Sequence, residues 1–317
     1  MFGRRISVHG RLMGEVRSAQ QKCVRRGLLE PLILLNLEHL LSQPDFSRGA
    51  LSRMQVIAAE DIGVGSLGLV AALMELESGW TRLDQIERAR RLIQASHLCC
   101  ACAASRFIPH WAVTVVKDVD IPLYMEDWRD LDELAIALDN AIRLGESHQA
   151  AILVEEIFLR HPIEKEEPLP GSAGLERSAM SVVWDKMSKH CPRDLRSCFE
   201  AWRKRFGPPS KEGIAARLFL YLALLAVCEK LSVDELVLPE VSRDEVKAWL
   251  QRARGEVYTI PDWMHDRHTP LGKKRKLGYA HFFEQAAQLT NPSESLGWKR
   301  EQDMMLRSKA VYLREEA

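Results

Sequence analysis

The sequence predicts an all-α protein built from stacked helical hairpins. Apolar residues recur at spacings of three and four along most of the chain, which is typical of amphipathic helices. One such run contains Leu131, Leu134, Leu138 and Ile142. Alternating, strand-like patterns are scarce, and the single β-prone run at residues 111–116 cannot form a sheet by itself. Prolines and glycines divide the chain into segments of helical length.

Composition indicates a folded protein with no general affinity for polyanions. Of the 317 residues, 46% are hydrophobic and 28% are charged, as in ordinary globular proteins. Lysine plus arginine equals aspartate plus glutamate at 44 each, so any contact with nucleic acid must come from local patches. The size suggests one large or two modest domains.

Cysteine usage favours an intracellular location. The seven cysteines include no Cys-x-x-Cys pair, so a structural zinc site is not expected, and an odd number without a secretory leader fits a reducing compartment. The basic N-terminus lacks the apolar core of a signal peptide, although it could hold an organelle-targeting segment. The most apolar stretch, residues 214–227, is too short to span a membrane and is predicted to be a buried helix. We therefore expect no membrane association.

Stretches rich in proline and glycine predict how the chain is divided into domains. The stretch 162–176 is rich in proline and glycine and is interpreted as a linker between an N-terminal helical domain, residues 1–161, and a C-terminal helical region, residues 177–317. A second break at residues 207–210 precedes the apolar helix. Pro239 and Pro261 delimit a further helix that contains Trp249.

Two segments, residues 19–38 and 137–156, echo each other faintly. Each has an arginine and then a glycine near its middle, Arg25 with Gly27 and Arg143 with Gly145. Both patterns predict a helix, a glycine turn and a second helix. An internal duplication and two unrelated hairpins both remain open.

The first of three notable segments is a cationic hairpin. It runs from Ser18 to Gly27 and continues into a helix that ends near Leu41. Arg25 and Arg26 follow Lys22 by three and four residues, so the three cations are expected to share one helical face. Such a strip can meet phosphate or an acidic partner, and a solvated face is the alternative.

The second segment, residues 53–63, is a helix with an acidic end. Glu60 and Asp61 fall in the last turn, where the helix dipole disfavours negative charge, and Gly63 suits a left-handed cap. The two acids therefore need a partner, and Arg53 is the candidate because it lies two turns back on nearly the same face. The alternatives are a polar network that fixes a helix crossing and an exposed acidic turn.

The third segment, residues 260–283, combines histidines with a basic run. It contains Asp266, Thr269, Gly278 and Tyr279, and its four adjacent cations are Lys273, Lys274, Arg275 and Lys276. Flanking glycines let a ligand approach the backbone, and four cations could neutralise several phosphates. A metal site from His265, Asp266, His268 and His281 is weighed against surface histidines and a capping aspartate, and the latter is preferred because the lysines would repel a cation.

In their order along the chain, and in the spacing between the first two, the three segments resemble the C-terminal helical, oligomerisation region of the RarA/MgsA replication-associated recombination proteins. The best match covers residues 18–72, with Glu60-Asp61-Ile62-Gly63 as its most specific part. The resemblance implies a helical domain like the collar of clamp loaders, here with a large helical insertion or a second helical subdomain. Residues 111–241 show no resemblance.

The family's ATPase module has no counterpart in this sequence. No Gly-x-x-x-x-Gly-Lys-Ser/Thr phosphate loop occurs, so only the docking role is carried over. We expect no catalytic residue, no metal and no cofactor. The structural motif residues by resemblance are Arg53, Glu60, Asp61, Gly63, Asp266, Thr269, Gly278 and Tyr279.

The sequence thus predicts a non-catalytic accessory factor of DNA replication, recombination or repair. It would self-associate, bind nucleic acid, DNA rather than RNA, and contact proteins of a replication or repair assembly. The expected nucleic-acid contacts are Lys22, Arg25, Arg26, Lys273, Lys274, Arg275 and Lys276. One alternative is a scaffold subunit with protein contacts only, and a weaker one is a divergent enzyme that uses His265, Asp266 and His268.

Overall fold

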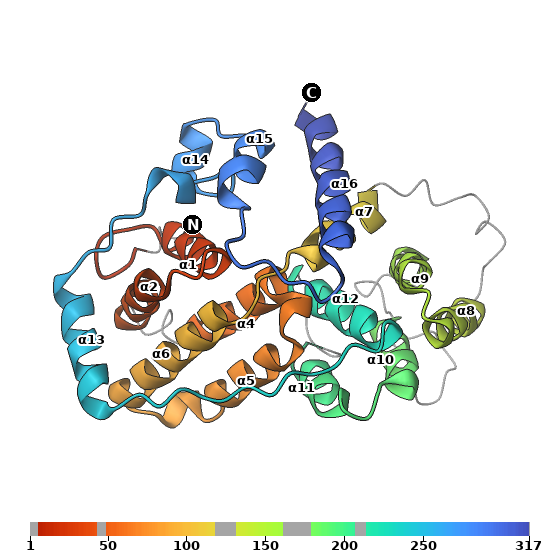
Figure 1. Ribbon diagram of the computed structural model, residues 1–317, viewed down its shortest axis with the longest axis horizontal. Coiled ribbons are helices and arrows are strands. Elements are labelled where there is room, and N and C mark those ends of the chain that lie inside the picture. Colours follow the sequence, from red (N-terminus) through yellow and green to blue (C-terminus); the bar gives the residue numbers. More distant parts are fainter. Residues whose placement is uncertain (1–5, 43–48, 118–130, 161–178, 207–213, 317) are drawn as a thin grey trace, which may run out of the picture. The chain divides into compact units, whose positions relative to one another are not determined.

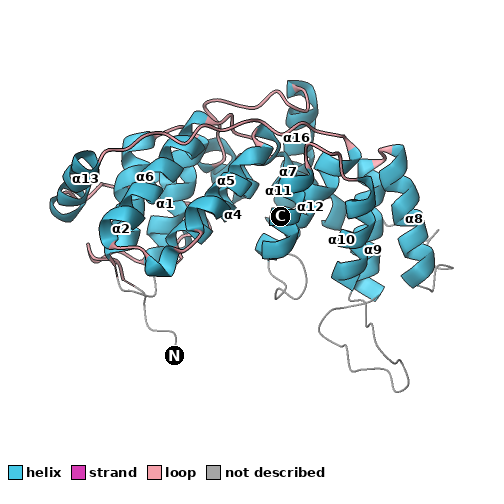
Figure 2. Ribbon diagram, turned by 90° about the horizontal axis from the view of Figure 1, so that it is seen from below, coloured by secondary structure: helices cyan, strands magenta, loops and turns pink. Residues whose placement is uncertain are grey.

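The protein is predominantly helical in the residues that the structure describes. A computed structural model describes residues 6–42, 49–117, 131–160, 179–206 and 214–316, and Figure 2 shows these parts as helices joined by loops. Within these ranges no strand is present, only two isolated β-bridges. The all-α prediction is therefore confirmed. The predicted breaks at residues 162–176 and 207–210 lie outside the described ranges.

The chain folds into two compact units (Figure 1). Unit 1 comprises residues 1–106 and 235–317, and unit 2 comprises residues 107–234. This division corrects the predicted boundary near residue 161. Residues 235–317 pack in unit 1 with the N-terminal hairpin. Acidic and apolar groups of this C-terminal stretch contact residues of the hairpin, as described below.

Unit 1 is arranged around one long helix, α6 (Gln85–Ala101), which packs against α1, α2, α4, α5 and α13. The bounds of the other elements, in chain order, are α1 (Met13–Arg25), α2 (Leu29–Leu41), α4 (Ala50–Asp61), η1 (Gly63–Gly65), α5 (Leu67–Glu77), η2 (Trp80–Arg82), α13 (Arg243–Gly255), η5 (Asp262–Met264), α14 (Pro270–Lys274), α15 (Tyr279–His281), the π-helical turn η6 (Phe282–Ala286) and α16 (Trp298–Glu316).

Unit 2 is arranged around α12 (Ile214–Cys228), which packs against α7, α8, α9, α10 and α11. The bounds of these are α7 (Phe107–Lys117), α8 (Leu131–Leu144), α9 (Ser147–Arg160), α10 (Ala179–His190) and α11 (Arg196–Phe206). The described part of α12 from Leu218 onward is buried on every side, as its continuous apolar sequence predicts. None of the described helices combines the length and apolar character that a bilayer span requires.

Local sequence signals account for several helix ends. Asp84 and Ser242 cap α6 and α13, because their side chains accept a hydrogen bond from the backbone three residues later. Gly63 follows α4 with φ +48°, which confirms the predicted left-handed cap. The β-prone residues 111–116 lie inside α7, where packing in the interior overrides their strand propensity.

Both echoing segments form the predicted hairpins. α1 and α2 are joined through Gly27 with φ +61°, and α8 and α9 are joined through Gly145 with φ +76°. A left-handed glycine between two helices is a common turn, so this geometry is compatible with duplication and with two unrelated hairpins.

Candidate functional site

The three segments singled out in the sequence meet inside unit 1. The end of α1 brings Lys22 and Arg25, the end of α4 brings Glu60 and Asp61, and the stretch from η5 to η6 surrounds them. Residues separated by more than two hundred positions thus share one buried ionic network. Its cationic and acidic members are Lys22, Arg25, Arg106, Glu60, Asp61 and Asp266.

Lys22 and Asp266 form a buried ion pair. Lys22 Nζ lies 2.5 Å from Asp266 Oδ2, and the two side chains are 2% and 1% exposed. Burial lowers the pKa of Lys22 to about 8, with the neighbouring Arg25 adding to the effect. Burial by itself raises the pKa of Asp266, but a hydrogen bond from His268 and the charge of Lys22 outweigh it and hold that pKa below its usual range. Asp266 therefore stays ionised and fixes the segment from η5 to α14 on α1.

Asp61 is held between two arginines. Arg25 Nε donates to Asp61 Oδ1 at 2.6 Å, and Arg106 Nη1 lies 3.6 Å from the same oxygen. Arg25 Nη2 is also 3.9 Å from Glu60 Oε1. Burial, together with the charge of Arg25, lowers the pKa of Arg106 to about 10. Two buried guanidinium groups close together need the Asp61 carboxylate to compensate their charge.

An aromatic ring completes this part of the network. The guanidinium carbons of Arg25 and Arg106 lie 5.7 Å and 5.2 Å from the centre of the Phe282 ring, close enough for cation–π attraction. Arg25 Nη1 also donates to the carbonyl oxygen of Ala286 at 2.7 Å. The π-helical turn after α15 is thereby fastened to α1.

The predicted partner of the acidic helix end was wrong. The ion pairs described for Glu60 and Asp61 are with Arg25 and Arg106, whereas Arg53 donates to Gln21 Oε1 at 3.0 Å. Arg53 acts on the acids only at longer range, and burial lowers its pKa. The polar network is present, but its cations come from other segments, which a single helix's spacing cannot reveal.

The prediction that Lys22 and Arg25 contact nucleic acid is also corrected. Each side chain is 2% exposed and engaged with an acid, so neither can reach a phosphate. Arg26 is partly exposed. Its guanidinium stacks 3.9 Å from the centre of the Trp263 ring and donates to the carbonyl oxygen of Gln285. The face of α1 that carries Lys22 and Arg25 turns inward because Asp61 and Asp266 neutralise it there.

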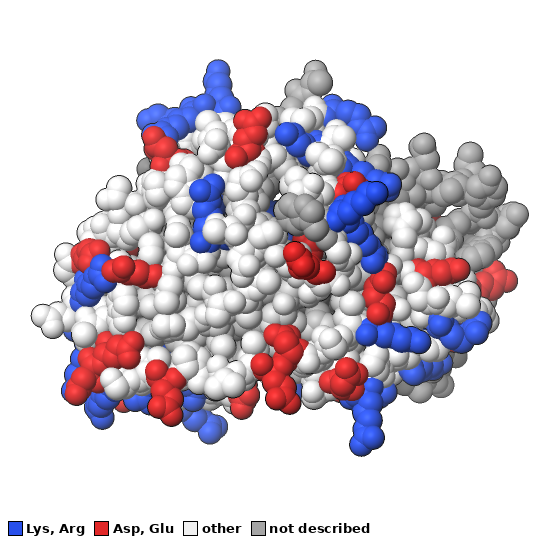
Figure 3. Space-filling model, viewed as in Figure 1, with Lys and Arg blue, Asp and Glu red and all other residues white. Residues whose placement is uncertain are grey.

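The basic run, by contrast, is exposed. Lys273, Lys274, Arg275 and Lys276 all lie on the surface at the end of α14, and Figure 3 shows Lys and Arg gathered over this element. Arg275 Nη1 donates to Asp262 Oδ1 at 2.8 Å, at the surface. These four cations are therefore accessible to a ligand, as the sequence predicts.

The turn that carries the basic run has a fixed conformation. Thr269 caps α14 by accepting a hydrogen bond from the backbone of Gly272, and Thr269 itself is bonded to the carbonyl of Asp266. A Cβ on Gly272 would lie 1.8 Å from the carbonyl oxygen of Asp266, so only glycine fits. The buried ion pair of Asp266 thus positions the basic run through three consecutive contacts.

Lys276 adopts a left-handed conformation, φ +56°. It ends α14 in a Schellman motif, in which Lys276 N donates to Lys273 O and Leu277 N donates to Gly272 O. Glycine is the usual residue at this position, because a side chain there costs about 1–2 kcal/mol. A charged side chain at this strained position is a candidate functional residue.

Gly278 and Tyr279 have ordinary backbone conformations and structural contacts. Gly278 precedes α15 with extended backbone, so its left-handed freedom is not used. Tyr279 stacks on Tyr312 of α16 with ring centres 4.2 Å apart, and the guanidinium of Arg267 lies 3.5 Å from the centre of its ring. The Gly-Tyr pair therefore connects the third segment to the last helix.

The sequence reasoning missed Arg106 as a network member and Glu301 altogether. Glu301, on α16, is 8% exposed, and burial raises its pKa to about 7 although Ser105 donates a hydrogen bond to it. Arg106 lies just beyond the end of α6. No local pattern marks either residue, because their partners are distant in the sequence.

The histidines and cysteines that the structure describes show no arrangement suited to a metal. Within the described ranges, no group of three or more His, Cys, Asp or Glu side chains is placed to hold an ion. Both Asp266 oxygens accept hydrogen bonds, from Lys22 and from the backbone of His268. Burial raises the pKa of Cys23, Cys99 and Cys100, so these thiols behave as apolar interior groups.

Comparison with protein-family models, with curated proteins and with solved structures finds no match to this chain.

Proposed function

We propose that the chain is a non-catalytic docking factor of nucleic-acid maintenance, acting in DNA replication, recombination or repair. Its basic run would contact the phosphate backbone, and the chain would self-associate and bind proteins of the same assembly. The link to DNA maintenance rests on the resemblance of the three segments to RarA/MgsA C-terminal regions. The absence of a phosphate loop from the sequence is the reason to propose docking without ATP hydrolysis.

One observation carries the nucleic-acid part of this proposal: four exposed cations stand on a turn whose conformation is fixed from the interior. A lysine in a disordered tail loses conformational freedom when it binds, whereas a preformed turn loses less. Lys276 belongs to this turn and has a left-handed conformation that glycine adopts more easily, so its charge can be removed while the turn is kept.

The basic run can be tested by salt-dependent binding. Fluorescence anisotropy with labelled single-stranded DNA, duplex DNA and RNA would compare the protein with a variant that has alanine at Lys273, Lys274, Arg275 and Lys276. Each lost phosphate contact reduces the slope of log K against log salt by about 0.9, so the slope should fall by up to about 4. Identical binding by both proteins would refute the assignment of the site.

A single substitution separates binding from stability. Lys276→Gly should raise the free energy of unfolding by about 1 kcal/mol, because glycine accepts the left-handed conformation, and should weaken nucleic-acid binding. Lys230 is the matched control, since it has φ +50° at the end of α12 in the same hydrogen-bonding motif but follows Glu229 and lies outside the basic run. Lys230→Gly should stabilise the protein equally and leave binding unchanged.

The alternative function is a scaffold subunit with protein contacts only. The burial of Lys22 and Arg25 favours it, because these two cations form ion pairs inside the protein and cannot contact a nucleic acid. A chain that binds none of the three nucleic acids at low salt would support the scaffold and overturn the proposed function.

A further inference from the structure

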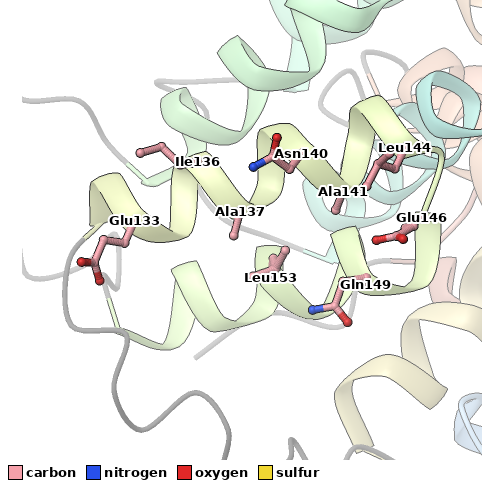
Figure 4. Close-up of a pocket in the computed structure, with 9 residues that line it drawn as sticks. All are labelled: Glu133, Ile136, Ala137, Asn140, Ala141, Leu144, Glu146, Gln149 and Leu153. Carbon is pink, nitrogen blue, oxygen red and sulfur yellow. The ribbon is translucent and has the colours of Figure 1, made fainter.

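The α8–α9 hairpin of unit 2 presents an apolar face. Ile136 and Leu144 of α8 are 59% and 60% exposed, which places them among the most exposed large apolar side chains described. Next to them is an open depression of about 630 Å³, lined by residues of both helices. Figure 4 shows Ile136, Asn140 and Leu144 along α8, with Ala137 projecting towards Leu153 of α9. Exposed apolar groups beside a hollow indicate a contact surface.

The spacing on α8 is symmetric about Asn140. Ile136 precedes Asn140 by four residues and Leu144 follows it by four, so all three stand on one face of the helix, about 6 Å apart along its axis. If a two-fold axis passes through Asn140, two copies of α8 run antiparallel. Ile136 of each copy then lies opposite Leu144 of the other, and both apolar contacts form at once.

The charges on this face are self-complementary. Glu133 lies near the start of α8 and Arg143 near its end, both exposed, and Arg143 Nη2 donates to Asn140 Oδ1 at 3.3 Å. In the antiparallel arrangement, Glu133 of one copy comes within about one helical turn of Arg143 of the other. A parallel arrangement would instead bring like charges together.

We propose that this face is the self-association surface, and that two copies of the chain pair through α8 about a two-fold axis. A second copy fits better than an unrelated basic helix, because the face carries both signs of charge, with Glu133 towards one end of α8 and Arg143 towards the other. This inference names the surface for the self-association in the proposed function and does not depend on nucleic-acid binding. A contact centred on one helix is smaller than a standard stable interface, so we expect a weak dimer with a dissociation constant between micromolar and millimolar.

Sedimentation equilibrium of the full chain without nucleic acid, over a range of concentrations, measures this dimer. Leu144→Glu and Ile136→Glu should each raise the dissociation constant at least tenfold, because each places two charges in the apolar contacts. Leu306→Glu is the matched control, since Leu306 of α16 is 56% exposed and lies in unit 1. Circular dichroism would confirm that all three variants fold.

A charge exchange tests the geometry itself. Glu133→Arg and Arg143→Glu should each weaken the dimer, and the double variant should restore it, because the pairing is reciprocal across the axis. Asn140→Cys should give an oxidised dimer joined through residue 140 of both copies, detectable by peptide mass spectrometry.

Several results would overturn the inference. They are a chain that stays monomeric up to millimolar concentration, a dimer that Leu144→Glu leaves intact, and a face that binds a basic amphipathic peptide but no second copy. A dimer that forms as expected in a protein that ignores nucleic acid would refute the proposed function and uphold this surface.

Discussion

The interiors of the two units differ in how they hold their helices together. In unit 1, a lysine, two arginines and two aspartates are buried around the ends of α1 and α4. In unit 2, α12 from Leu218 onward is apolar apart from Tyr221, whose hydroxyl donates to Glu155, and Arg217 at the partly exposed start of the helix pairs with the same glutamate. Ion pairs require a particular partner at a particular angle, whereas apolar contacts require only volume and shape.

This difference affects how freely each interior can vary in sequence. Each charged residue in the interior of unit 1 requires a partner of opposite charge at a fixed position. Many apolar sequences can fill the interior of unit 2 equally well. The comparison leads to four predictions, which test whether the two interiors respond differently to substitution.

The largest effect is expected at Asp61. Asp61→Ala should lower the free energy of unfolding by about 3–5 kcal/mol, because it leaves Arg25 and Arg106 buried without their shared carboxylate. Urea denaturation measures this loss. Asp61→Asn, which keeps the shape, should lose a similar amount. A loss below about 1 kcal/mol in both variants would mean that the network is not important for stability.

A slightly smaller loss is expected from the apolar interior. Leu222 of α12 is fully buried, and Leu222→Ala should cost about 3 kcal/mol through lost transfer energy and the cavity that remains. This loss should not vary with pH, because the substitution removes no ionisable group. Native-state hydrogen exchange would show whether amides of unit 2 lose protection while those of unit 1 keep theirs.

A pH-dependent effect of roughly 2 kcal/mol is expected from Glu301. Its pKa is raised to about 7, so the folded state holds a proton that the unfolded state releases above its ordinary pKa near 4.5. The contribution of Glu301 to the free energy of unfolding is fully present below about pH 4.5 and is lost as the pH rises through about 7. Thermal denaturation between about pH 5 and pH 8 should show this decline, and Glu301→Gln should flatten it. If stability declined with pH equally in Glu301→Gln and in the natural protein, Glu301 would be excluded as the source of the decline.

The smallest effect is expected when a buried ion pair is replaced as a whole. Lys22→Met alone should cost about 3–5 kcal/mol, because Asp266 is left buried without its cation. The double variant Lys22→Met with Asp266→Leu should lie within about 1 kcal/mol of the natural protein. A double variant as unstable as the single one would show that the pair contributes more than charge compensation.

The sequence predicts the helical content well and the tertiary contacts poorly. The helix ending near Leu41, the apolar helix from Ile214 and the left-handed Gly63 all follow from local patterns and are confirmed. Such patterns report on neighbours within a few residues. The predicted boundary near residue 161 differs from the division into two units. Residues 235–317 belong to unit 1 through contacts with segments that are distant in the sequence.

The candidate site shows the same limit. The exposure of Lys273 to Lys276 follows from an uninterrupted basic run that no interior could neutralise. Lys22 and Arg25 have the same kind of local pattern, yet they are buried, because Asp266 and Asp61 come to meet them. Whether a cation is free depends on residues far away, and Arg106 and Glu301 were missed for that reason.

The discontinuous path of unit 1 has a consequence for synthesis. A ribosome releases Lys22 and Arg25 long before Asp266, the partner of Lys22, and the turn around Phe282 have been translated. In the interval, unit 2 can finish folding, whereas the N-terminal hairpin lacks part of its compensating charge. The N-terminal hairpin therefore acquires its last contacts only after the rest of the chain has been translated. A transcript truncated before Asp266 would yield a protein whose N-terminal hairpin stays incompletely folded, and such a protein is a target for chaperones and proteases.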